Sequence, residues 1–173
     1  GVWNRSINNG RTAVTVAQDV AVDSKDNVFV VGAGIVGDTN WIITRLNQSS
    51  GATIWQNSYD PGFGDYALAI AIDSNDDLIV VGSQSSNSGD TDENWRIMKL
   101  DSGGNTIWIK VYNFTGPLSN QDVPYDVSID FYNNIYVAGT INGKSNSPGL
   151  IMKFNTNGNN IWNTTLGTVG TAY

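Results

Sequence analysis

The sequence contains no cysteine and no histidine. Without cysteine the chain forms neither a disulfide framework nor a thiol nucleophile. Without histidine it has no Ser-His-Asp triad and no imidazole ligand for a metal. Charged residues make up only 14% of the chain, against roughly 25% in an average soluble protein, and Glu93 is the only glutamate. These absences exclude most familiar catalytic centres and leave aspartate carboxylates as the candidate acid–base groups.

Long apolar runs are also missing, since no stretch approaches the roughly 18 residues of a membrane-spanning helix. The net charge of −7 is a poor match to nucleic acid or anionic lipid. We therefore expect neither a nucleic-acid partner nor membrane insertion. Low charge and many Asn, Ser and Thr residues are typical of extracellular or cell-surface proteins. The chain begins with Gly1, and we interpret it as a mature or trimmed chain.

Tryptophan recurs at nearly constant intervals of 52, 53 and 54 residues, at Trp3, Trp55, Trp108 and Trp162. Upstream of the last three lies a matching block, at 19–32, 69–82 and 126–139. A shorter matching segment follows each block, at 43–46, 97–100 and 151–154. Three copies in the same register exclude coincidence, so we predict a single repeat array over residues 1–173.

Each copy predicts four short strands and essentially no helix. The first strand alternates small or polar with branched apolar residues, as at Val20 and Val22. The second is a β-branched and aromatic run that we expect to end at Gly32, Gly82 or Gly139. The hairpin between them places Asp26, Asp76 or Asn133 where positive φ is expected.

The third predicted strand carries a recurring base, Arg45, Lys99 or Lys153, which we interpret as paired with nearby Asp side chains or carbonyls. A Gly/Asn turn then leads into the fourth strand, which contains the recurring Trp. Four antiparallel strands per repeat of about 50 residues is the pattern of a β-propeller blade.

With its Asp-x-x-x-Asn-Val-like block, its Gly turn and its Trp, the chain resembles the seven-bladed-propeller-type repeats of secreted bacterial and archaeal proteins. The segment 46–55 is also similar to the tryptophan-docking repeats of quinoprotein propellers, although their vicinal Cys pair is impossible here. The second resemblance implies that Trp3, Trp55, Trp108 and Trp162 pack between neighbouring blades. Neither resemblance specifies a function.

The predicted organisation is an all-β array of three four-stranded antiparallel blades with an extra N-terminal strand. We expect the Trp strand of a preceding blade at 1–10, blades at 11–58, 59–112 and 113–166, and a lead-out at 167–173. Because propellers typically need four to eight blades, three do not close a ring. We therefore expect the chain to associate with copies of itself, as a ring or a filament, or with further blades of a longer chain.

The carboxylates allow two kinds of chemistry. Asp19 and Asp126 occupy equivalent first-strand positions, and Asp60, Asp65 and Asp122 precede such strands. We interpret them as turn caps and strand hydrogen-bond acceptors, with polysaccharide hydrolysis or lyase activity as the alternative. We interpret the loop with Asp90, Asp92 and Glu93 as a solvated acidic loop, and the alternative is a calcium-binding loop. Apart from that calcium, we predict no cofactor.

Two further sets are candidate surface features. Trp41 and Trp95 have Gly149 as their counterpart in the third repeat, so the repeat does not require them, and we expect a contact surface there. Asn-x-Ser/Thr sequons occur at Asn4, Asn47, Asn113 and Asn163, which makes them glycosylation candidates, although chance alone gives about as many.

Together these features predict a non-catalytic extracellular structural or adhesive protein that acts through self-association or protein–protein contacts, as in a filament or a surface layer. The alternative is a portion of a larger carbohydrate-active or ligand-binding propeller.

Overall fold

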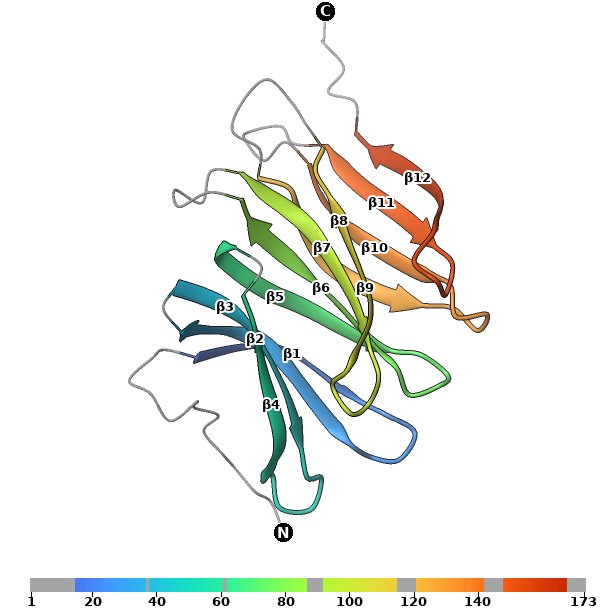
Figure 1. Cartoon of the computed structure of the whole chain (residues 1–173). Helices are drawn as coiled ribbons and strands as arrows, with labels where there is room; N and C mark the ends of the chain where they lie inside the picture. Colours follow the sequence, from blue (N-terminus) through green and yellow to red (C-terminus); the bar gives the residue numbers. More distant parts are fainter. Residues whose placement is uncertain are drawn as a thin grey trace, which may run out of the picture.

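The computed structural model describes residues 15–36, 38–60, 62–86, 92–114, 121–141 and 148–167. In these ranges the chain forms strands and no helix, so no helix that could cross a membrane is found there. The strands form three four-stranded antiparallel sheets, stacked in chain order (Figure 1). The all-β fold with three four-stranded blades is confirmed. The extra strand expected at 1–10 lies outside the described residues.

Each sheet follows the chain from one edge strand to the other. The first sheet consists of β1 (Thr15–Val22), β2 (Val28–Val36), β3 (Asp38–Leu46) and β4 (Thr53–Tyr59). The second consists of β5 (Phe63–Ile72), β6 (Leu78–Ser85), β7 (Glu93–Leu100) and β8 (Thr106–Tyr112). The third consists of β9 (Val123–Ile129), β10 (Ile135–Thr140), β11 (Gly149–Phe154) and β12 (Asn160–Leu166).

The hairpin between the first two strands of each sheet has the conformation that the sequence predicts. Asp26, Asp76 and Asn133 have φ values of 62°, 64° and 61°. An aspartate at the start of each turn fixes the loop, as Asp73 does by accepting the backbone N–H of Asp77 at 3.1 Å. Short polar side chains tolerate this left-handed region better than other non-glycine residues, which accounts for the recurring Asp and Asn.

The recurring glycine does not end the second strand, so that prediction is wrong. The strands β2, β6 and β10 all continue past it. In each sheet the first strand bulges opposite the glycine, and a Cβ there would lie within 1.8–2.2 Å of a first-strand carbonyl oxygen. Glycine is therefore required inside the strand, because the bulge brings the neighbouring backbone too close for any side chain.

The hydrophobic core lies between the sheets rather than within any one of them. We call the face that a sheet turns toward the next sheet in the chain its forward face, and the opposite face its rear face. Between the first and second sheets, Phe29 and Ile43 on a forward face pack with Val80 and Met98 on a rear face. An equivalent cluster joins the second and third sheets. Each sheet–sheet boundary is thus the unit that stabilises the stack.

Candidate functional site

Trp41 and Trp95 are fully buried, with an exposed fraction of 0%, so the contact surface predicted for them is wrong. Each lies on a forward face and crosses the boundary to the next sheet. The indole N–H of Trp41 donates to the Ser83 carbonyl at 2.9 Å, and that of Trp95 donates to the Thr140 carbonyl at 3.0 Å. Each ring occupies the space left by the glycine of the next sheet's second strand. A buried tryptophan at this position therefore requires that the next sheet has a glycine at the bulge opposite it.

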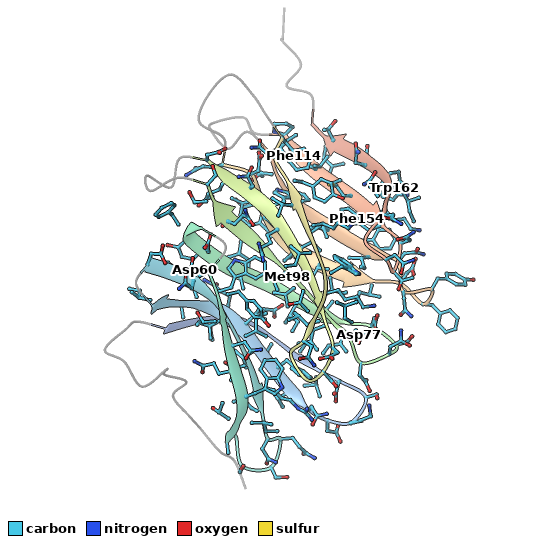
Figure 2. All side chains as sticks on the ribbon, in the orientation of Figure 1. Asp60, Asp77, Met98, Phe114, Phe154 and Trp162 are labelled. Carbon is cyan, nitrogen blue, oxygen red and sulfur yellow. The ribbon has the colours of Figure 1, made fainter. Side chains whose placement is uncertain are left out.

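The fourth-strand tryptophans also lie at these boundaries. Trp55 is half-buried over Gly104 of the second sheet, and its indole N–H donates to the Ser102 carbonyl at 3.3 Å. Trp108 makes the equivalent contact with the third sheet, donating to the Thr156 carbonyl at 3.3 Å. Trp162 lies on the outer strand β12, where it is 41% exposed (Figure 2). Trp3 lies outside the described residues.

Polar clamps join the hairpins of neighbouring sheets. Asp76 accepts the backbone N–H and the hydroxyl of Ser24, each at 3.0 Å, and pairs with Lys25 at 2.5 Å. Hydrogen bonds from Lys25 and from Ser24 lower the pKa of Asp76 to about 2. At the next boundary Asn133 takes the same position and accepts the Ser74 N–H at 3.1 Å. The left-handed turn residues thus also serve as acceptors for the preceding sheet.

The recurring base pairs with acidic groups in the second and third sheets, in agreement with the sequence interpretation. Lys99 is buried and contacts Asp73 at 2.7 Å and Asp77 at 3.1 Å. Burial acts to lower the pKa of Lys99, but the hydrogen bonds to both aspartates outweigh it and raise the value. Lys153 lies 3.7 Å from Asp130 in a more exposed pair.

In the first sheet the corresponding base, Arg45, donates to the Asn27 side-chain oxygen at 2.8 Å and to the Ser102 carbonyl at 3.3 Å. The second contact crosses to the next sheet, so this base also contributes to a boundary.

The first-strand aspartates act as backbone acceptors. Asp19 accepts the Val20 N–H at 2.8 Å and, across the boundary, the Ile70 N–H at 2.9 Å. Asp126 accepts the Val127 N–H at 2.8 Å. Both stand at the bulge of a first strand, where an extra residue interrupts the regular pairing.

The three aspartates that the sequence places before first strands differ from one another in burial, and Asp65 lies within β5 rather than before it. Asp60 is exposed, and Figure 2 shows it at one end of the sheets. Asp122 is fully buried and accepts the Phe114 N–H at 2.8 Å. Asp65 is fully buried and accepts the Ser85 N–H at 3.1 Å. Within the described ranges no three acidic groups converge as a metal would require.

The candidate calcium loop is described only in part, because Asp90 lies outside the described residues. Asp92 accepts the Ser86 hydroxyl and Glu93 begins β7. We predict that the loop binds no structural calcium, so excess chelator leaves Tm unchanged to within about 1 °C. Differential scanning calorimetry with EDTA and with added calcium checks this. A fall in Tm on chelation that calcium reverses would contradict it.

Three of the sequon asparagines, Asn47, Asn113 and Asn163, are exposed, and Asn4 lies outside the described residues. The Asn47 side-chain oxygen accepts the backbone N–H of Ser50 at 3.0 Å and so holds the β3–β4 turn. Glycosylation at these positions stays a prediction.

One hollow lies beside the hairpins of the second and third sheets. It has a volume of about 410 Å³ and is lined by Ile72, Ser74, Ile129, Asp130, Phe131 and Asn133. Phe131 is 93% exposed and its neighbour Tyr132 is 79% exposed, with their rings edge to face at 5.6 Å. The first repeat has Ser24 and Lys25 at these positions, so the fold does not require the aromatic pair.

Stacked four-stranded sheets with equivalent boundaries define an all-β repeat protein of propeller type. A family model described as the beta-propeller repeat matches residues 116–145, a range that includes β9 and β10. The third sheet therefore contains a β-propeller repeat. Because the first two sheets share its strand order and its turns, the chain is an array of β-propeller-type repeats, as the resemblance implied.

No curated protein matches the sequence. Among solved structures, the tail fiber of Staphylococcus aureus phage P68 is similar, with 11% identity and a TM-score of 0.32. The match covers 88% of this chain and 39% of the tail-fiber chain. A likeness at this level carries no argument about assembly or function.

Proposed function

We propose that this chain is a non-catalytic structural or adhesive protein, located outside the cell or on its surface, that acts through self-association or protein–protein contacts. The observation that carries the proposal is the exposure of the two outermost sheet faces. Inside the stack, the equivalent faces are covered by neighbouring sheets.

The forward face of the third sheet is one of these faces. Ile151 is half-buried there, whereas its counterparts Ile43 and Ile97 are 0% and 1% exposed. Ala138 is exposed, whereas its counterpart Val81 is 0% exposed. Apolar surface that the repeat buries elsewhere is therefore accessible to a partner.

The first strand of the first sheet shows the same contrast on its rear face. Val20 is 58% exposed, whereas its counterparts Ile70 and Val127 are 6% and 7% exposed. In the described ranges β1 and β12 are edge strands, as are β4, β5, β8 and β9, and an edge strand can pair with another chain. Both features support contacts with another copy or with a further blade.

The hydrogen bonds and ion pairs of the aspartate carboxylates support the proposal that the chain is non-catalytic. The recurring aspartates accept backbone N–H groups or pair with lysines, as Asp73 does with Lys99. Carboxylates held in this way fix turns and boundaries rather than remaining available to a substrate.

Sedimentation velocity over a wide concentration range tests the proposal. We expect reversible species heavier than the 18.6 kDa chain. Trp162→Ala, and separately the pair Phe131→Ser with Tyr132→Lys, should weaken association about tenfold because they remove exposed aromatic contacts. Ile107→Ser on β8 is the matched control, since this position is about equally exposed in all three sheets. A monomer at every concentration would contradict self-association.

A second candidate function, glycan binding, is favoured by the hollow beside Phe131. An exposed aromatic face beside Ser74 and Asn133 combines stacking and hydrogen-bonding groups of the kind that sugars use. Titration of the protein with a glycan panel tests it. Binding that Phe131→Ser abolishes would favour this candidate, and no binding to any glycan would eliminate it.

A further inference from the structure

Asp65 is a buried carboxylate at the boundary between the first two sheets. It lies on β5, a strand of the second sheet that contacts β1, β2 and β3 of the first. Its exposed fraction is 0%. One carboxylate oxygen, Oδ1, accepts the Ser85 N–H at 3.1 Å, whereas Oδ2 is buried and has no hydrogen-bond partner among the described residues. An ionised carboxylate is costly in such a position, because the described part of the chain supplies Oδ2 with no hydrogen-bond donor to compensate its charge.

The charged groups around Asp65 come from three elements. Asp38 begins β3 and Asp60 precedes β5, and both carboxylates repel a charge on Asp65. Arg96 on β7 is the cation that interacts with it. The Arg96 guanidinium donates to the Gln84 side chain at 2.8 Å and lies 5.7 Å from the Trp41 ring centre.

These surroundings favour the neutral acid. Burial is the main cause that raises the pKa of Asp65, to about 6, with Asp38 and Asp60 acting in the same direction. The backbone N–H groups of Ser85 and Gly62 act against the rise. A carboxyl with this pKa changes charge in mildly acidic solution.

We propose that Asp65 is a proton-operated switch at the first boundary, which closes the boundary when the carboxyl is neutral and loosens it when the carboxyl is ionised. The proton adds at Oδ2, because Oδ1 is engaged by Ser85. When Asp65 is ionised, its negative charge lies near that of Asp38 on the first sheet and that of Asp60 between β4 and β5. This inference does not depend on the proposed function, since it concerns the packing of one chain.

The sign of the pH dependence follows from proton linkage. Because the folded chain holds the Asp65 proton up to about pH 6 and the unfolded chain releases it near pH 4, stability falls as pH rises between these values. One proton changes the folding equilibrium constant tenfold per pH unit, or about a hundredfold over this window. Asp76 and Asp130, with pKa values lowered to about 2, lose their stabilisation only below this window.

Urea unfolding from pH 4.5 to 7.5 tests the proposal on the wild type, on Asp65→Asn and on the exposed control Asp26→Asn. The wild type and the control should lose about thirtyfold in the folding equilibrium constant as pH rises from 4.5, whereas Asp65→Asn should be nearly flat. In the wild type, the Ser85 amide should also exchange hydrogen faster above pH 6.5, after correction for intrinsic exchange.

A direct carbon-13 NMR titration of the Asp65 carboxyl decides the matter even if Asp65→Asn fails to fold. A midpoint near pH 6 supports the switch, and a midpoint near pH 4 overturns it. An Asp65→Asn protein that keeps the wild-type slope also overturns it.

Discussion

Replacing Trp95 by alanine is expected to destabilise the protein by about 3 to 5 kcal/mol. The indole is 0% exposed and fills the boundary between the second and third sheets, against Gly139 and edge to face with Phe114 at 5.5 Å. Truncation leaves a large cavity and removes the hydrogen bond to the Thr140 carbonyl, whose length is 3.0 Å. Urea or thermal unfolding followed by tryptophan fluorescence measures the loss.

Trp162→Ala is the matched control for Trp95→Ala. It removes the same side chain from an edge strand where the ring is 41% exposed, and we expect a loss of less than about 1 kcal/mol. Comparable losses in the two variants would show that the boundary indoles do not hold the stack together. Because this comparison concerns unfolding of the single chain, it is made at concentrations where the protein is monomeric.

The sequence was sufficient to predict the repeat, its four strands and the conformation of its turns. Period-two alternation and the recurring Asp or Asn are local signals, and positive φ at Asp26, Asp76 and Asn133 depends on local chemistry alone. The pairing of Lys99 with Asp73 was also predictable, since both positions recur in register within one repeat.

The contact surface predicted at Trp41 and Trp95 was wrong, because their counterpart Gly149 suggested that the fold does not need an indole at this position. The indole fills a space that exists only where the next sheet has a glycine in its second strand. The contact therefore involves residues from different repeats, such as Trp41 and Gly82. The role of the recurring glycine was missed for the same reason, since the first-strand bulge appears only in the strand pairing.

Burial that arises between sheets is equally hard to predict from one strand. Asp65 and Asp60 are both loop-flanking aspartates in the sequence, yet one is fully buried and the other exposed. The difference arises because β5 lies against three strands of the preceding sheet, while Asp60 precedes that contact. A repeat pattern therefore predicts the blade well and the chemistry at its boundaries poorly.

Replacing Lys99 by alanine is expected to cost about 3 to 5 kcal/mol, because it leaves buried negative charge without its cation. The Lys99 side chain is 6% exposed, its Asp73 partner 2% and its Asp77 partner 19%. Urea unfolding at neutral pH measures the loss. Lys153→Ala is the control at the equivalent position, where the ion-pair distance is 3.7 Å and the side chains are 19% and 27% exposed. There we expect a loss of about 1 kcal/mol or less.

A second variant separates lost charge compensation from lost packing at Lys99. Combining Lys99→Met with Asp73→Asn removes one cation and one anion while keeping the side-chain volumes and the Asp73 Oδ1 acceptor that holds the turn. If unpaired charge causes the loss, the double variant should be more stable than Lys99→Met alone. If Lys99→Met alone is as stable as the wild type, the lysine contributes mainly through packing of its alkyl chain beside Trp108, its cross-strand neighbour, and the ion pair has little net effect.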